Sequence, residues 1–374
     1  MDHVDRIAEG FVPPPYPYDK LDRLAALCVA HEGGMVDLSI GTPCDPPPSS
    51  VIAALASSDS ERGYPPSIGT VGLRSAIRSW IERRFGLDVT LDQIAACVGT
   101  KEFVATTPHY LRLRTPSRDT VLYPAVAYPT YEMGAILAQC RPVAVPSRPD
   151  GGLDLAAIDP TDAARALMLW VNSPSNPTGA LSDLDAAAAW GRSNGVPVFS
   201  DECYVEFIWE GRPRTILEQG IEGVVAVHSL SKRSNLAGLR VGFYAGDEAL
   251  VTYLKEVRKH VGLLVPGPAQ AAGAVALADD IHVNVQRDRY LRRLERLAVV
   301  LSRWSGLEVP LPAGGFYLWF DAGDGWGFAE QLARAGGALV SPGDFYGGGG
   351  ANNVRVAVVQ PDDRIDQVAR RLGV

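Results

Sequence analysis

The segment ALMLWVNSPSNPTGALSDLDAAAAWGRSNGVPVFSDECY, residues 166–204, shows the pattern that determines the fold. Residues 166–171 form an uninterrupted apolar run, which is typical of a strand buried on both faces. Ser182 and Asp185 then form a capping signal for a helix, and residues 196–199 form the next apolar run. Strand, helix and strand in this order predict a parallel sheet covered by helices.

Three successive strands of this kind run into polar loops. The loops are SPSNPTG at 173–179, SDECY at 200–204 and HSLSK at 228–232, the last following an apolar run at 224–227. Because consecutive crossovers in an open parallel sheet share one hand, the ends of these strands emerge at the same edge of the sheet. The sequence therefore predicts that the three loops meet at one site.

The remainder of the chain extends this α/β pattern. A helix is expected at 71–85, with Thr70 as its N-cap and Gly86 as its stop. From about residue 280 the sequence pattern changes. An amphipathic stretch at 285–304 is followed by two strand-like runs, EVPLP at 308–312 and FYLWF at 316–320. A helical segment at 328–335, the strand NVRVAVV at 353–359 and a final helix that begins at Asp362-Asp363 complete the chain.

This change in the sequence pattern predicts two domains. We expect a large domain at 36–279, with a mostly parallel sheet, and a smaller α/β domain at 280–374. Residues 1–35 are expected to form an N-terminal arm, rich in proline at its start, and part of the small domain.

Composition excludes several classes of protein. The 374 residues contain 35 Lys and Arg against 43 Asp and Glu, a net charge of −8, which argues against non-specific binding to nucleic acid or anionic membranes. The five cysteines form no CxxC pair and have no histidine at ligand spacing, so neither a disulfide framework nor a metal site is expected. With no signal peptide or long apolar segment in view, a cytoplasmic location is expected.

Two charged residues in the loops suggest chemistry. Asp201 directly follows an apolar strand, where a carboxylate needs a cationic partner. Lys232 also follows a strand and lies among the hydroxyls of Ser229 and Ser231, where an amine can stay partly deprotonated for Schiff-base chemistry. On these residues alone, a simple Asp201–Lys232 ion pair remains an alternative.

Four motifs carry a resemblance to a known family. NPTG at 176–179, DECY at 201–204, SLSK at 229–232 followed by Arg240, and VRVA at 354–357 resemble, in order and spacing, the class I/II pyridoxal-phosphate (PLP) aminotransferases of fold type I. The resemblance extends from about Leu38 to the C-terminus. Within this family, the motifs are most similar to those of actinobacterial N-succinyldiaminopimelate aminotransferases.

The resemblance implies a role for each matching residue. Lys232 would be the catalytic lysine that forms the internal aldimine and moves the proton, and Asp201 would pair with the pyridinium nitrogen. Tyr204 and Asn176 would bond the ring oxygen, and Tyr128 would stack on the ring. The cofactor phosphate would be held by Gly99, Thr100, Lys101, Ser229 and Arg240.

The substrate and the oligomer follow from the same resemblance. Arg355 would bind the substrate α-carboxylate, with Gly41 and Asn176 lining the substrate pocket. Tyr64 would reach the phosphate of a neighbouring subunit, which implies a homodimer with shared active sites. Because many relatives have a small residue at the position of Lys101, its contact could be the phosphate or a distal carboxylate of the substrate.

The implied reaction is a ping-pong transamination with glutamate and 2-oxoglutarate. The closer resemblance implies N-succinyl-LL-2,6-diaminopimelate as the amino substrate, in lysine biosynthesis. Its distal carboxylates require further cations, and the candidates are Lys101, Arg233, Lys259 and His260. Two alternatives stay open: another PLP-dependent aminotransferase, lyase or cyclase on the same fold, or a PLP-binding regulatory module without turnover, which the presence of Lys232 and Arg355 disfavours.

Overall fold

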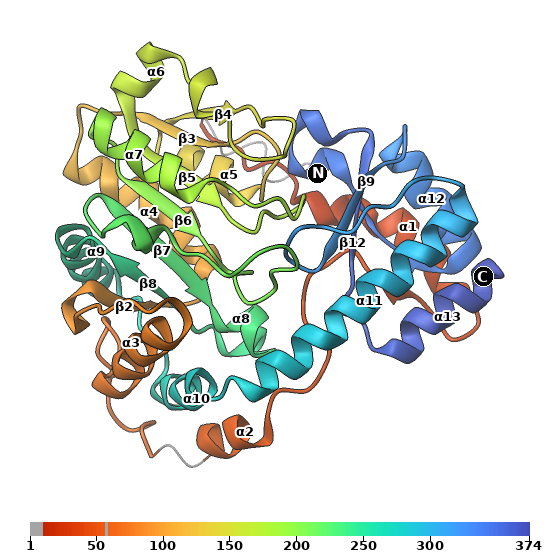
Figure 1. Cartoon of the computed structure of the whole chain (residues 1–374), viewed down its shortest axis with the longest axis horizontal. Coiled ribbons are helices and arrows are strands. Elements are labelled where there is room, and N and C mark those ends of the chain that lie inside the picture. Colours follow the sequence, from red (N-terminus) through yellow and green to blue (C-terminus); the bar gives the residue numbers. More distant parts are fainter. Residues whose placement is uncertain (1–9, 57–58) are drawn as a thin grey trace.

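The computed structural model describes residues 10–56 and 59–374, and a seven-stranded sheet forms the centre of the larger of its two parts (Figure 1). The start of the predicted N-terminal arm, residues 1–9, lies outside the described residues. In spatial order the strands are β2 (Ile94–Cys97), β8 (Gly242–Gly246), β7 (Val224–Ser229), β6 (Val198–Asp201), β5 (Ala166–Asn172), β3 (Thr120–Pro124) and β4 (Arg141–Val145).

The sheet is mostly parallel, as the sequence predicts. Strands β4, β3, β5, β6 and β7 pair in parallel, whereas β8 is antiparallel to both of its neighbours, β7 and β2. At the carboxyl edge, Asn172 of β5 lies opposite Asp201 of β6. The three loops that follow β5, β6 and β7 therefore leave the sheet side by side.

Helices cover both faces of the sheet. One apolar core lies beneath α2 (Ser49–Ala56), α3 (Val71–Phe85), α7 (Leu184–Asn194) and α10 (Gly267–Ala278). The other core lies beneath α4 (Thr100–Arg114), α5 (Thr130–Leu137) and α9 (Glu248–Val261). Strand residues alternate between the two cores, which explains why these strands read as continuous apolar runs. The short helix α6 (Pro160–Arg165) precedes β5.

Local capping explains where two of these helices begin. Helix α3 has the predicted bounds: the Thr70 side chain accepts a hydrogen bond from Leu73 N, and Gly86 adopts the left-handed conformation after the last turn. The predicted Ser182 cap of α7 is wrong. Asp183 caps that helix instead, because its carboxylate accepts from Ala186 N, whereas the Ser182 hydroxyl donates to the Asn172 carbonyl at 3.4 Å.

A smaller α/β unit follows α10. Its strands form two sheets. The three-stranded sheet has the order β11 (Ser341–Pro342), β12 (Asn353–Ala357) and β9 (Tyr317–Asp321). The two-stranded sheet pairs β1 (Val36–Asp37) with β10 (Ala338–Leu339). Its helices are α1 (Asp22–Val29), α11 (Ile281–Ser305), α12 (Gly325–Gly336) and α13 (Asp362–Leu372). The strand expected at 308–312 is absent, since Pro310 and Pro312 cannot donate to a ladder.

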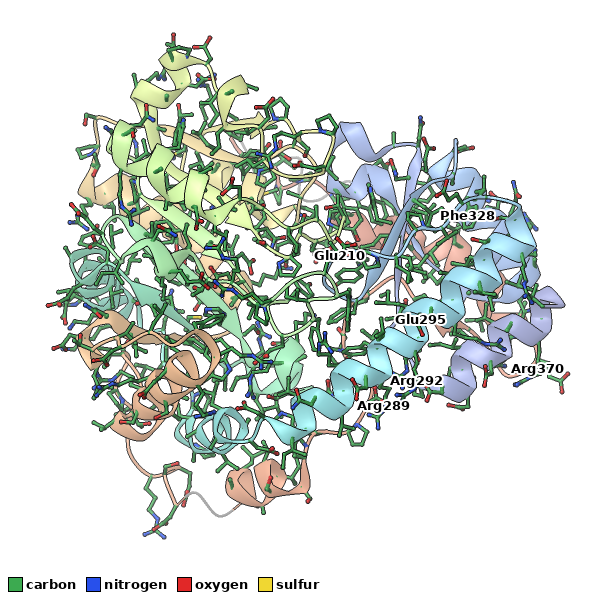
Figure 2. The ribbon with its side chains drawn as sticks, in the orientation of Figure 1. Glu210, Arg289, Arg292, Glu295, Phe328 and Arg370 are labelled. Carbon is green, nitrogen blue, oxygen red and sulfur yellow. The ribbon has the colours of Figure 1, made fainter. Side chains whose placement is uncertain are left out.

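Helix α11 joins the two parts of the molecule. It runs from the side of α10 to the C-terminal strands (Figure 1) and carries Arg289, Arg292 and Glu295 along its length (Figure 2). The domain bounds 1–35, 36–279 and 280–374 stay a prediction, and β1 lies with the C-terminal unit through its pairing with β10. Among the described helices, none combines the length and the apolarity that crossing a membrane requires.

Candidate active site

A cavity opens at the carboxyl edge of the large sheet, next to the small unit. Most of the residues predicted for the site line it: Gly41, Thr100, Lys101, Tyr128, Asn176, Asp201, Tyr204, Ser229, Lys232, Arg240 and Arg355. Gly99 lies at its margin, against the Arg240 side chain. The structure thus brings together residues that are more than 300 positions apart in the sequence.

Lys232 presents its amine to this cavity. It lies in the short helix α8 (Leu230–Arg233), which Ser229 caps through a hydrogen bond from Ser231 N to its hydroxyl. The Lys232 amine donates to the Gly41 carbonyl. Desolvation, with the charges of Arg355 and Arg240 acting in the same direction, lowers the pKa of Lys232 to about 8. A fraction of this amine is therefore neutral, and nucleophilic, near neutral pH.

Asp201 is buried at the end of β6 without an ion-pair partner among the described residues. Its Oδ2 accepts a 2.8 Å hydrogen bond from the Tyr131 phenol, and its Oδ1 accepts from Cys203 N at 3.2 Å. Burial raises the pKa of Asp201. The alternative Asp201–Lys232 ion pair is not formed, so the carboxylate is left to accept a cationic group from outside the chain.

An anion cradle lies where α4 begins. Gly99 precedes this helix with φ of 76°, and no side chain caps the amides of the first turn. The Arg240 guanidinium lies over Gly99: a Cβ on this residue would stand 2.6 Å from Arg240 Cζ. No acidic partner of Arg240 occurs in the part of the chain that the structure describes. Arg240 Nη1 donates to the Ala237 carbonyl at 2.9 Å, which leaves the charge of the guanidinium without a counter-ion in this described part of the chain. Such a guanidinium beside a helix N-terminus is suited to a phosphate.

The Arg355 guanidinium is a second positively charged group that lines the cavity. It is buried and lies between the rings of Tyr317 and Tyr346, 4.1 and 4.8 Å from their centroids. It donates to Asn176 Oδ1 at 2.8 Å, to the Tyr18 hydroxyl at 3.1 Å and to a backbone carbonyl. All these partners are neutral, so the positive charge remains available for a carboxylate.

The N-terminal arm reaches the cavity, which the sequence did not indicate. Tyr16 and Tyr18 line it, on either side of Pro17. Tyr16 accepts a 3.0 Å hydrogen bond from the Lys101 amine, which also lies 4.4 Å from its ring centroid. The two tyrosines thus contact two of the cations that line the cavity, Lys101 and Arg355.

Three further tyrosines belong to the site and were missed. Tyr131 bonds Asp201, and Tyr317 lies with its hydroxyl 3.0 Å from that of Tyr204. Tyr346 packs on Arg355. Only Tyr131 had a local signal, since it lies in the same AYPTY motif as Tyr128, whose ring it meets edge to face. In this structure Tyr204 and Asn176, expected to bond a cofactor ring, bond Tyr317 and Arg355 instead.

Several predicted positions lie away from the cavity. Arg233 is buried against Glu206 and Asp280, which excludes it as a ligand of a distal carboxylate. Lys259 pairs at 3.9 Å with Glu256 on the exposed face of α9, and neither it nor His260 is among the residues that line the cavity. Tyr64 is 97% exposed.

The site therefore combines a reactive amine, an unpaired buried carboxylate and an anion cradle. These groups fit an aldehyde, a pyridine nitrogen and a phosphate, which are the three parts of PLP. The fold and this donor set define a PLP-dependent enzyme.

Comparison with known proteins identifies the family. The model of aminotransferase class I and II matches residues 33–372, so the chain belongs to this family and is a PLP-dependent aminotransferase acting on amino and 2-oxo acids. The 4-dedimethylamino-4-oxo-anhydrotetracycline transaminase OxyQ of Streptomyces rimosus is 41% identical over 369 residues, which cover 96% of this chain and 99% of that protein.

Two other relatives carry different substrate names. The LL-diaminopimelate aminotransferase of Aquifex aeolicus is 32% identical, and the match covers 96% of each chain. The solved structure of a probable N-succinyldiaminopimelate aminotransferase from Thermus thermophilus matches with a TM-score of 0.84 at 30% identity, covering 95% of this chain and 98% of that one. These names agree on the reaction class and differ in the substrate.

Proposed function

We propose that this aminotransferase exchanges an amino group between N-succinyl-LL-2,6-diaminopimelate and 2-oxoglutarate. One observation carries the proposal: two cations, Arg355 and Lys101, face one cavity, and neither has a carboxylate partner among residues 10–56 and 59–374. Two separate cations suit an amino acid with a second carboxylate far from its reacting carbon. The likeness to the Thermus thermophilus structure named above supports the same substrate.

We propose separate roles in cofactor binding and proton transfer for residues that line or border the cavity. When bound, PLP takes the amino group of one substrate and gives it to a 2-oxo acid. We propose that Lys232 Nζ binds the cofactor aldehyde and carries the proton from the substrate α-carbon, while Asp201 keeps the ring nitrogen protonated. Tyr128 would stack on the ring, and Tyr204 and Asn176 would donate to its oxygen, Asn176 through the Nδ2 that its bond to Arg355 leaves unused. Gly99, Thr100, Ser229 and Arg240 would hold the phosphate.

The substrate contacts are proposed from the two cations. Arg355 binds the α-carboxylate, with Asn176 and the backbone of Gly41 beside it. Lys101 binds the distal carboxylate rather than the phosphate, because its amine bonds Tyr16, on the arm side of the cavity. The Gly41 position has no room for a Cβ, since the Tyr317 ring lies against it.

We also propose a homodimer with shared active sites. Tyr64 is exposed and lies outside the cavity of its own chain, as a residue that reaches a neighbouring site must. Sedimentation should show a dimer, and Tyr64→Ala should weaken PLP binding without lowering the melting temperature of the apoprotein. A monomer with full activity would exclude this assembly.

The test is a panel of amino donors, each mixed with the PLP-loaded enzyme while the cofactor absorbance is followed. N-succinyldiaminopimelate and glutamate should give fast half-reactions, and a monocarboxylic donor such as alanine a slow one. Lys101→Gln should raise the KM for N-succinyldiaminopimelate about tenfold and leave that for alanine unchanged, whereas Lys259→Gln, a matched surface change, should alter neither. Equal effects of Lys101→Gln on both donors would contradict the proposal.

One observation favours a second substrate. The cavity wall contains Tyr16, Tyr18, Tyr128 and Tyr317, and such rings suit a flat polycyclic substrate of the kind that the name of OxyQ indicates. If an anhydrotetracycline ketone accepts the amino group faster than 2-oxoglutarate does, this second function replaces the first.

A further inference from the structure

Arg233 follows Lys232 directly but points away from the cavity, into the protein. Its side chain is only 4% exposed. All five of its N–H donors meet an acceptor: Nε donates to Glu206 Oε1 (3.0 Å), Nη1 to Ser234 Oγ (3.2 Å) and Ala276 O (2.6 Å), and Nη2 to Asp279 O (3.4 Å) and Asp280 Oδ1 (2.7 Å).

Glu206 is the buried centre of this cluster. It lies two residues after Tyr204, in the loop that follows Asp201, and is 3% exposed. Besides Arg233, it accepts a 2.9 Å hydrogen bond from the Trp80 indole and a further one from Arg84, both on α3. The loop that carries Asp201 and Tyr204 is thereby fixed to the helix that carries Lys232.

The other arm of Arg233 reaches the junction between α10 and α11. Ala276 lies in the last turn of α10, and Asp280 is the residue before α11 begins. Figure 1 shows that α11 runs from this junction to the C-terminal unit. One guanidinium therefore connects the lysine helix, the loop after β6 and the residue that precedes the helix joining the two parts of the molecule.

Stability alone does not explain this arrangement. Removing an arginine and a glutamate from water carries a large desolvation penalty, and apolar residues at such positions are often as stabilising. A lysine carries its three donors on a single nitrogen atom. It cannot replace a planar guanidinium, whose three nitrogen atoms donate to acceptors in several directions. The guanidinium fixes the relative orientation of α8, the loop after β6 and the start of α11, which an apolar side chain cannot do.

We propose that Arg233 is a positioning residue that fixes the Lys232 amine relative to the Asp201–Tyr204 loop and to the start of α11. The inference rests on the proposed role of Lys232, and it assigns to Arg233 a part that does not involve contact with substrate or cofactor.

The experiment compares Arg233→Gln, Arg233→Lys and a control, Arg84→Gln. Arg84→Gln removes the other arginine from Glu206 but leaves every contact of Arg233 in place. For each apoprotein we would measure the melting temperature and, after adding PLP, the rate at which a borohydride-trapped adduct forms at Lys232. The kcat and KM of the loaded enzymes complete the comparison.

Arg233→Gln should slow adduct formation about tenfold and lower kcat with little change in KM, because a displaced amine loses its reactive geometry. Arg84→Gln should lower the melting temperature but keep the rate within about twofold. Arg233→Lys should recover part of the melting temperature and still react at least about threefold slower than the wild type. If Arg233→Gln does not fold, the rate of adduct formation in Arg233→Lys tests the proposal.

Two other outcomes are informative. Adduct formation at the wild-type rate in the folded Arg233 variants, or an equal slowing in Arg84→Gln, would overturn the inference and leave the proposed function intact. Failure of the proposed role of Lys232 has a different signature, since Lys232→Ala would then retain turnover. Failure of the proposed substrate would appear only in the panel of amino donors.

Discussion

The phenol of Tyr131 donates a 2.8 Å hydrogen bond to Oδ2 of Asp201, and both side chains are buried. Tyr131 also stacks on Trp170, with ring centroids 5.3 Å apart, so its hydroxyl is held in one position. Burial alone raises the pKa of Asp201, and this bond opposes the rise. Tyr131 thus helps Asp201 to remain an anion, as the pairing with a pyridinium nitrogen requires.

Tyr131→Phe should therefore reduce the negative charge available at Asp201. Hydrogen bonds to charged groups are worth about 1.5 to 3 kcal/mol, so kcat should fall about tenfold or more. Tyr253→Phe is the matched control, since it removes a phenol hydrogen bond to a backbone carbonyl on α4, away from the cavity. Tyr131→Phe should lose more stability than Tyr253→Phe, because its phenol bonds a buried carboxylate and not a neutral carbonyl. Only Tyr131→Phe should lose activity, and equal kcat values in both would exclude the role of Tyr131.

Gly99→Ala should weaken the anion cradle. The residue has φ of 76°, and a Cβ would collide with the Arg240 guanidinium. Gly86→Ala is a control for adding a Cβ at a positive φ, because Gly86 has φ of 71° and no atom lies within 4 Å of the added Cβ. Its αL backbone, with ψ of 23°, strains an alanine less than the backbone of Gly99, where ψ is 153°. We expect the dissociation constant of PLP, measured by fluorescence titration, to rise at least about tenfold for Gly99→Ala. It should stay near the wild-type value for Gly86→Ala.

The reaction of the apoprotein with PLP should show the lowered pKa of Lys232. An amine attacks an aldehyde in its neutral form, and the pKa of Lys232 is about 8 rather than the usual 10.5. The rate of adduct formation should rise about tenfold per pH unit below pH 8 and level off above it. A rate that keeps rising to pH 10 would show an ordinary lysine at this position.

The strand ends explain how much of the site could be predicted. Asn176, Asp201 and Lys232 follow consecutive parallel strands, and the order of the strands alone places them at one edge. The contact between Tyr18 and Arg355 spans 337 positions and has no local pattern that would reveal it.

Arg233 failed as a prediction for a related reason. In a helix, neighbouring side chains point roughly 100° apart. Lys232 therefore faces the cavity while Arg233 faces Glu206, although the two residues are adjacent in the sequence. Only the orientation of α8 on the sheet decides which cation serves the site.

Arg355→Gln should impair substrate binding while leaving the cofactor in place. The guanidinium is held between Tyr317 and Tyr346, where its fork can meet a carboxylate, and glutamine carries neither the charge nor the fork. Breaking a buried charge pair costs about 2 to 5 kcal/mol, so kcat/KM for glutamate should fall by roughly 30-fold or more. The dissociation constant of PLP should stay near the wild-type value, because the proposed phosphate, ring and aldehyde contacts involve other residues. A kcat/KM within about twofold of the wild type would remove Arg355 from the site, whereas loss of PLP binding would show that its role is to hold the cavity together.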